Sequence, residues 1–274
     1  MSKSFATTLL LVCALFCLTS IHSPQALADR SIFQTFGGVP VESNQTLIFG
    51  GSFSPPTMEH MGLVTKLMAR FGFLKAKMIV ANPYKKGAAP AKVSLGLTYT
   101  AVENADEVLR PNSIDYTDFT RTGPGSSAWT GGEGKRFELS VDDIEIRTNT
   151  KENALKTIRL LRENAKSAKE NFWLAGGDSF ASVPTWTPEW RELFEHTNWI
   201  IVSRAGLAGD EKSVRFHEKN PLLRSLGEDF LKNYNYFFDK TNQMHVYRNR
   251  DSAKPDIFVV DQPALPDSST TNRK

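Results

Sequence analysis

Short apolar runs of strand type alternate with helical patterns along most of this 274-residue chain. The runs that favour strands lie at residues 46–49, 76–81, 137–146, 172–175, 199–202 and 256–260. Helical spacing of apolar residues predicts helices at residues 58–70, 94–109, 151–168, 189–196 and 222–234. This alternation predicts an α/β fold, with an open, mostly parallel sheet and helices on both faces. Ligands bind such sheets at the carboxyl ends of the strands, which makes candidates of the loops at residues 50–60, 176–186 and 266–273.

The first 28 residues differ from the rest of the chain. Lys3 precedes an apolar run over residues 5–18, and Gln-Ala-Leu-Ala at residues 25–28 offers a small-x-small cleavage site before Asp29. This is the pattern of a secretory signal peptide, because the run is shorter than the roughly 20 residues that span a bilayer. An uncleaved anchor is the alternative. We expect export, for example to the periplasm, and no membrane association after cleavage; the protein is cytoplasmic if the segment is not functional.

Both cysteines, Cys13 and Cys17, lie in this segment, so a cleaved chain would have neither disulfides nor cysteine-ligated zinc. Residues 29–45 form a polar lead-in, and residues 46–274 are expected to form the main domain. Two stretches fit the alternation poorly and are interpreted as insertions: residues 110–136, rich in Gly, Ser and Thr and expected to be exposed, and residues 205–250.

The charge balance, 33 basic against 30 acidic residues, gives no indication of a nucleic-acid partner. The oligomeric state is not indicated.

The loop at residues 50–60 joins a predicted strand to a predicted helix. Gly50 and Gly51 would let the backbone approach a ligand closely. The helix that begins near Thr57 would present free N–H groups and the positive end of its dipole, which attract phosphate. His60, in the first turn, can donate a hydrogen bond to a phosphate oxygen as charge develops. Taken alone, two glycines and a nearby histidine favour a tight turn with a surface histidine.

The wider segment resembles the signature of the nucleotidyltransferase superfamily, Gly-Gly-(Ser/Thr)-Phe-(Asp/Asn)-Pro-x-(His/Thr)-x-x-His. Here it reads Gly-Gly-Ser-Phe-Ser-Pro-Pro-Thr-Met-Glu-His. Ser54 replaces the usual Asp or Asn, and Glu59 the usual Gly. Thr57 is typical of the eukaryotic nicotinamide-mononucleotide branch, where bacterial members usually carry a first histidine. The resemblance implies a Rossmann-like fold, catalytic roles for His60 and Thr57, and nucleotide contacts from Gly50, Gly51, Ser52 and Phe53.

Residues 172–186 are similar to the bacterial nicotinate-mononucleotide adenylyltransferases, with a strand, a Gly-Gly-Asp turn and then Pro-x-Trp. The resemblance implies that Asp178 meets the adenosine ribose and that Trp186 lies against the pyridine ring, a contact that suits a flat aromatic side chain. The alternatives are a helix N-cap for Asp178 and a core position for Trp186. We interpret Trp190 as packing. Arg204, at the end of the strand at residues 199–202, would face the nucleotide.

Two further stretches extend the resemblance. Ser-Ser-Thr-Thr-Asn-Arg at residues 268–273 looks like a family element whose hydroxyls and guanidinium hold the ATP phosphates. It implies phosphate contacts from Ser268, Ser269, Thr270 and Arg273. Relatives continue with a helix, so an Arg273 next to the chain end is expected to be less fixed. Lys85 or Lys86 would approach phosphate, or the two form a solvated surface pair.

The resemblance therefore predicts an enzyme that binds ATP and a pyridine mononucleotide. It would transfer AMP from ATP to nicotinate mononucleotide, giving deamido-NAD and pyrophosphate. Mg²⁺ would bridge ATP oxygens and keep most of its ligands as water, so no dedicated protein metal site is expected. Glu145 stands where relatives carry a Glu, but residues 152–158 replace a Ser-Tyr-Thr element that contacts the pyridine. The alternatives left open are nicotinamide mononucleotide or another phosphorylated acceptor, and a non-catalytic nucleotide-binding protein.

Overall fold

The computed structural model describes residues 35–36, 39–53, 55–82, 90–150, 154–203 and 214–262. All of them belong to one folded unit. Several sequence predictions lie outside the described residues: the signal peptide, Lys85, Lys86, Arg204 and residues 268–273. Within the described residues, no helix combines the length and apolarity needed to cross a bilayer.

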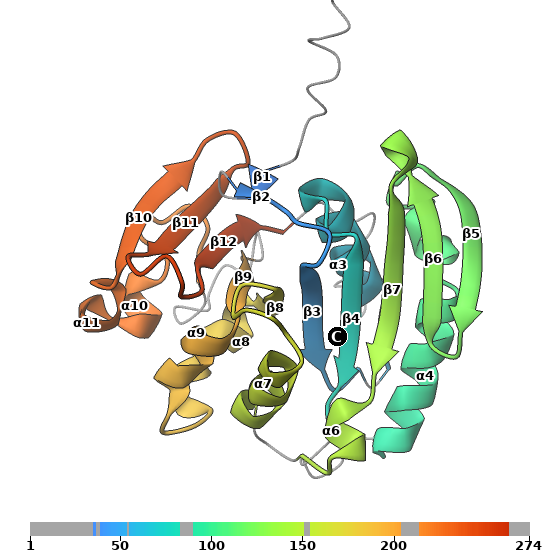
Figure 1. Ribbon diagram of the computed structural model, residues 1–274, viewed down its shortest axis with the longest axis horizontal. Helices are drawn as coiled ribbons and strands as arrows, with labels where there is room; N and C mark the ends of the chain where they lie inside the picture. Colours follow the sequence, from blue (N-terminus) through green and yellow to red (C-terminus); the bar gives the residue numbers. More distant parts are fainter. Residues whose placement is uncertain are drawn as a thin grey trace, which may run out of the picture. The chain divides into compact units, whose positions relative to one another are not determined.

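A ten-stranded sheet organises the described residues, in the order β10-β11-β12-β9-β8-β3-β4-β7-β6-β5 (Figure 1). The central strands pair in parallel: β12 (Ile257–Asp261), β9 (Asn198–Ser203), β8 (Asn171–Gly176), β3 (Thr46–Gly51), β4 (Lys75–Val80) and β7 (Arg136–Asp142). Antiparallel strands extend both sides: β10 (Tyr234–Asp239) with β11 (Met244–Asn249), and β6 (Ser126–Gly131) with β5 (Tyr116–Gly123). A separate short ladder pairs β1 (Thr35–Phe36) with β2 (Val39–Pro40). The predicted fold class is confirmed.

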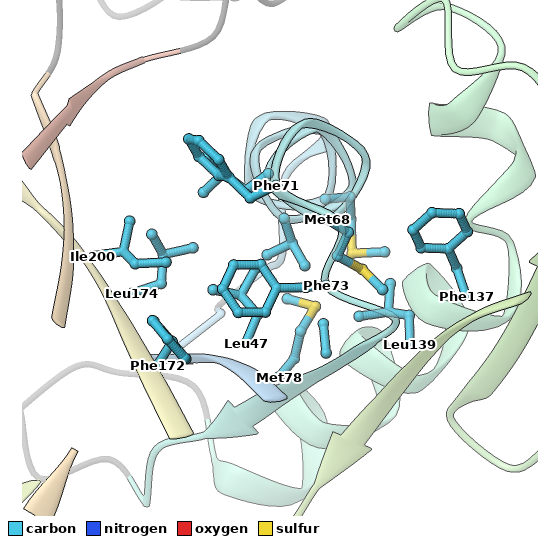
Figure 2. Close-up of a cluster of buried hydrophobic side chains, with 14 of the residues drawn as sticks. Leu47, Met68, Phe71, Phe73, Met78, Phe137, Leu139, Phe172, Leu174 and Ile200 are labelled. Carbon is cyan, nitrogen blue, oxygen red and sulfur yellow. The ribbon is translucent and has the colours of Figure 1, made fainter. Parts of the chain in front are cut away.

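Helices pack on both faces of this sheet, over two separate apolar clusters. The first cluster takes side chains from α3 (Met58–Phe71), α4 (Ala91–Glu103) and α5 (Asp106–Leu109). Figure 2 shows part of it, with Met68 of α3 beside Leu47 and Met78 of the sheet. The second takes side chains from α6 (Ile144–Arg147), α7 (Ala154–Glu163), α8 (Gly177–Ala181), α9 (Leu193–His196), α10 (Leu223–Leu226) and α11 (Glu228–Leu231). Because both faces are covered, inner strands such as β9 and β12 are buried almost throughout, whereas β7, nearer the edge, alternates.

The path of the chain fixes where a ligand can bind. From β3 the chain adds β4 and then β7 on one side, and then returns to add β8, β9 and β12 on the other side. The order therefore reverses between the neighbours β3 and β8, where Phe49 pairs with Leu174. The crevice beyond the carboxyl ends of two such strands is where open α/β sheets bind ligands. The two sequence motifs at residues 50–60 and 176–186 follow these two strands.

Helix α3 shows why this crevice has a defined wall. Its buried residues recur at helical spacing, including Met61, Val64 and Leu67, which fixes the face turned to the sheet. Thr57 caps its first turn, and Gly72, with φ of 76°, ends it by donating its N–H to the Met68 carbonyl. The predicted helix at residues 58–70 is confirmed, and its amino end lies at the crevice.

Two expectations for the weaker stretches were wrong. Residues 110–136 are not exposed throughout, because β5 and β6 extend the sheet and Trp129 is 1% exposed, stacked on Phe137 at 5.7 Å. Glycines of the hairpin, such as Gly125 with φ of 61°, account for the loop-like composition. The predicted helix at residues 222–234 is two short helices separated at Gly227, with φ of 77°, followed by β10. The described part of residues 205–250 thus supplies two strands of the same sheet.

Three other predicted elements have different limits. The strand at residues 137–146 ends at Asp142, where α6 follows. The helix at residues 189–196 starts as a 3-10 turn (Trp190–Glu192) before α9. The helix predicted at residues 151–168 ends at Glu163, because residues 164–168 form turns and bends, and residues 151–153 lie outside the described part.

Candidate active site

A cavity of about 450 Å³ opens at the point where the strand order reverses. The loop after β3 and the start of α3 contribute most of its wall, and the loop after β8 contributes the rest. Predicted site residues in this wall are Gly50, Gly51, Ser52, Phe53, Thr57, His60 and Asp178. The structure therefore brings together two motifs separated by more than a hundred residues. We name this the first cavity.

His60 has a defined orientation because it takes part in the cap of α3. The Thr57 backbone N–H donates to His60 Nδ1 at 3.0 Å, and the His60 N–H donates to Thr57 Oγ1 at 3.4 Å. This reciprocal pair is a capping box in which histidine stands where Glu or Gln is usual. Since Nδ1 accepts a hydrogen bond, the proton of the neutral imidazole is on Nε2. This tautomer carries its N–H on Nε2, which is the form needed to donate to a phosphate oxygen.

Two phenylalanine rings hold the imidazole from the side. Phe53 meets it edge-on at 5.5 Å between ring centroids, and Phe49 lies 5.8 Å from it. Phe53 is 3% exposed and has φ of 41°, which is unfavourable for a residue with a side chain. The strained turn therefore positions His60, and Phe53 could meet a ligand mainly through its backbone.

The protein's own packing leaves little room for a side chain at either glycine. A Cβ atom at Gly50 would lie 2.6 Å from Cζ2 of Trp173, and one at Gly51 would lie 3.0 Å from Cε1 of Phe53. The space beside these two glycines is therefore occupied by the side chains of Trp173 and Phe53, and is not left for a ligand. Because Gly50 and Gly51 have no side chains, their backbone lines the cavity directly.

Asp178 faces the same cavity from the other side. The N-cap of α8 is Gly176, with no side-chain capping bond, so the alternative that Asp178 caps this helix is excluded. Its side chain is exposed and lines the cavity together with Ser179. Glu59 and Gln262 also line it, the latter directly after β12. Sequence reasoning gave no site role to Ser179, Glu59 or Gln262, since a single polar residue in a helix or after a strand carries no distinctive pattern.

A second cavity of about 600 Å³ adjoins the first. The two share part of their wall, including Gly50, Gly51, Gly176 and Ser179. Trp186 lines the second cavity, half-buried, with Nε1 donating to Ser182 Oγ at 2.9 Å and its ring 6.3 Å from Trp199. Trp190 instead packs on Phe194 and Phe230, which confirms its interpretation as packing.

Comparison with known proteins places this arrangement in a family. The family model described as Cytidylyltransferase-like matches residues 48–274, which is most of the chain and includes both cavities. The chain belongs to the cytidylyltransferase-like family.

Among curated members similar to this chain, the "probable nicotinate-nucleotide adenylyltransferase" of Chromobacterium violaceum is 26% identical over 160 residues, 58% of this chain and 62% of the relative. The protein of the same name from Marinomonas sp. is 24% identical over 164 residues, 60% of this chain and 61% of the relative. The chain thus spans about three fifths of the length of these relatives. Among solved structures, Plasmodium falciparum nicotinic acid mononucleotide adenylyltransferase complexed with NaAD gives a TM-score of 0.47 at 14% identity, covering 81% of this chain and 77% of that one.

Glu145 lines the second cavity and connects the segment after β4 to α7. Its carboxylate accepts a hydrogen bond from the Thr157 hydroxyl at 2.8 Å and from the Asn82 backbone N–H at 3.1 Å. Burial raises the pKa of this carboxyl, and the two hydrogen bonds oppose that rise. The side chain holds the end of β4 against α7 at the cavity wall.

A pH dependence of stability follows from Glu145. Its pKa is raised in the folded protein above the usual 4.5, so the folded state holds this proton more tightly than the unfolded state. The contribution of Glu145 to stability should be greatest below pH 4.5 and should fall as the pH rises through the raised pKa. We expect the unfolding free energy of the wild type, relative to Glu145→Gln, to decrease over that window in urea titrations. A difference that is constant with pH, or increases, would contradict this.

The remaining predicted contacts stay predictions. In the chain, Arg204 follows β9, which is next to β8 in the sheet, and residues 268–273 come after β12, which is next to β9, but these residues lie outside the described part. Lys85 and Lys86 follow β4 and lie outside it as well. Within the described part, no group of three or more His, Cys, Asp or Glu side chains could hold a metal ion.

Proposed function

We propose that this protein is an adenylyltransferase that transfers AMP from ATP to nicotinate mononucleotide, giving deamido-NAD and pyrophosphate. The observation that carries the proposal is the pair of adjoining cavities with a shared glycine-rich wall. Joining two nucleotides requires two pockets whose reacting ends meet, since orientation supplies much of the rate enhancement. The names of the curated relatives support the same reaction.

The first cavity has the features needed for the triphosphate. The amino end of the 14-residue helix α3 lines it, and a helix amino end attracts phosphate through its N–H groups and dipole. A phosphate oxygen of the acceptor would attack the α-phosphorus of ATP, and the bond from that phosphorus to the pyrophosphate oxygen would break. His60 would donate from Nε2 to the reacting phosphate, where negative charge must be stabilised. Asp178 would bind the ribose hydroxyls.

The residues outside the described part complete this proposal as predicted from the sequence. Lys85 or Lys86, Arg204 and Arg273 would supply positive charge to the phosphates, and Ser268, Ser269 and Thr270 would donate hydrogen bonds. Mg²⁺ would enter with ATP. The cavity offers the carboxylates of Glu59 and Asp178, which are oxygen ligands of the kind Mg²⁺ accepts, and ATP oxygens and water would supply the rest. The ion's chemistry is to offset charge on the phosphates.

Trp186 provides a specific test of the second cavity. We expect Trp186→Ala to raise KM for the mononucleotide about 10- to 100-fold, the range for loss of one aromatic stacking contact, with little change in KM for ATP. Trp190→Ala is the matched control, because Trp190 lines neither cavity. Steady-state kinetics with each substrate varied in turn measures both constants. An equal rise in both KM values would show that Trp186 does not select the acceptor.

The reaction itself is tested by pyrophosphate release from the purified protein with ATP and Mg²⁺. Nicotinate mononucleotide, nicotinamide mononucleotide and phosphopantetheine would be compared as acceptors, and the proposal requires the first to be the best substrate. If another acceptor were turned over faster, the protein would still be a nucleotidyltransferase, but nicotinate mononucleotide would not be its preferred substrate.

A non-catalytic nucleotide-binding role is the second candidate. The observation that favours it is Glu59, whose carboxylate lines the cavity proposed for the triphosphate and would repel phosphate. Calorimetry that detects ATP binding, in a protein that releases no pyrophosphate with any acceptor, would establish this role in place of the enzyme.

We also propose that the first 28 residues direct export and are removed. Mass spectrometry of the protein from its native host should then find a mature N-terminus at Asp29. A chain that retains residues 1–28 would contradict cleavage.

A further inference from the structure

One edge of the sheet exposes an unusual run of aromatic side chains. Strand β10 is the last strand on its side in Figure 1, with β11 as its one neighbour in the sheet. Three successive residues are exposed: Tyr236 by 39%, Phe237 by 42% and Phe238 by 37%. Because successive side chains of a strand point to opposite faces, aromatic surface is exposed on both faces of this edge.

The opposite edge of the same sheet is protected against further pairing. Strand β5 has two register shifts against β6, and Asp118 within it has φ of 51°. It also carries the exposed charged residues Asp118 and Arg121. Irregular backbone and charge are the usual means by which proteins prevent edge strands from pairing with other chains.

Strand β10 has none of these protective features. All six of its residues pair with β11 in one continuous register, from Tyr234 with Asn249 to Asp239 with Met244. It contains no proline, and its one charged residue is the terminal Asp239. One row of its backbone N–H and C=O groups pairs with β11, and no other strand of the described residues pairs with the opposite row. An unprotected apolar edge of this kind favours pairing with another strand.

We propose that this edge binds a second copy of the chain, with β10 pairing antiparallel to β10 of the partner across a two-fold axis. Every copy presents the same strand, so a two-fold contact satisfies both edges at once. If this axis is perpendicular to the sheet, each side chain stays on its own face of the sheet in both copies. Residues directly opposite each other share a face, so their two residue numbers must add to an even sum. A register centred on Phe237 places Phe237 opposite its counterpart and Tyr236 opposite Phe238 twice, which are favourable aromatic pairs.

Charge selects this register over its neighbour. Centred on Phe237, the strands place Asn235 opposite Asp239 and Tyr234 opposite Lys240, so no like charges meet. Centred on Tyr236, they would place Lys232 opposite Lys240, and like charges directly opposite are destabilising. Centred on Phe238, they would place Phe237 opposite Asp239 and retain only one aromatic pair, so the sequence favours the register centred on Phe237.

The proposal is independent of the proposed reaction, because no residue of β10 lines either cavity. Light scattering of the purified full chain during size-exclusion chromatography should give twice the chain mass. Phe237→Lys should raise the dimer dissociation constant about 100-fold or more, because a symmetric interface carries the substitution twice. Thr117→Lys, on the exposed surface of the protected β5 edge, should leave the mass unchanged. The circular dichroism melting curve of each variant verifies folding, and Phe237→Ser replaces Phe237→Lys if the latter does not fold.

Cysteine cross-linking tests the register. Phe237→Cys should give a covalent dimer on mild oxidation, since the two residues at the centre lie opposite each other. Asn235→Cys should not, because its counterpart would be displaced along the strand. Both variants need Cys13 and Cys17 replaced by Ser. A monomer at all concentrations, a Phe237→Lys variant that remains dimeric, or equal cross-linking at both positions would each overturn the proposal.

Discussion

Replacing His60 by Gln should lower kcat for nucleotidyl transfer about 100- to 1000-fold, the range measured for loss of one donor to developing charge. The melting temperature should change little. Gln is a usual residue at this position of a capping box, so it can accept the Thr57 N–H that His60 Nδ1 now accepts. The substitution thus removes the imidazole and retains the cap of α3. Steady-state kinetics and a thermal melt on the same preparation measure the two effects.

The control separates the two roles of the histidine. His60→Ala removes the imidazole and its capping bond together, so it should lose activity and also about 1 kcal/mol of stability, the usual cost of a lost cap. If Gln retained wild-type activity while Ala lost stability, His60 would be only a capping residue and the catalytic proposal would be wrong.

Trp199→Ala should lower the free energy of unfolding by about 3–5 kcal/mol, the range for truncating a buried aromatic residue. Trp199 is 0% exposed, and its ring lies 5.1 Å from Phe194 and 5.6 Å from Phe180. The loss is a large share of the roughly 5–15 kcal/mol that stabilises a typical domain. Urea unfolding followed by circular dichroism measures it.

Trp190→Ala is the matched comparison for this cluster. Trp190 contacts Phe194 and Phe230 from a half-buried position, so its truncation should cost less than half as much as Trp199→Ala. Equal losses would mean that burial does not set the stability of this cluster. Trp199→Ala should also raise KM for the mononucleotide, because Trp186 packs on Trp199.

The central strands could be predicted from the sequence because they are buried on both faces. The runs at residues 47–49 and 199–202 are apolar throughout, and helices on both sides make any other composition costly. The edge hairpins carry no such signal. In β6, buried Trp129 stands among Ser, Thr and Gly, and its partner Phe137 lies beyond the turn. Strand β6 is therefore identified by the contact of Trp129 with a neighbouring strand, which a local stretch of sequence does not show.

The candidate site, like the sheet, could be predicted from the sequence only in part. The sequence could indicate which loops form it, since glycines, a helix start and polar residues follow predicted strands. It could not show that Trp173 requires Gly50 to be a glycine, because that contact joins positions more than a hundred residues apart. Nor could it show that Nδ1 of His60 is used by the Thr57 backbone, which determines the tautomer. The division into two cavities also depends on the reversal of strand order between β3 and β8.

A crystal structure of the protein with a non-hydrolysable ATP analogue and nicotinate mononucleotide tests the central claim most directly. The account predicts the α-phosphate of the analogue within hydrogen-bond distance of His60 Nε2. It also predicts the pyridine ring against Trp186, with the mononucleotide phosphate reaching across the wall formed by Gly50 and Gly51. Both ligands bound away from these two cavities, or a triphosphate turned away from His60, would contradict it.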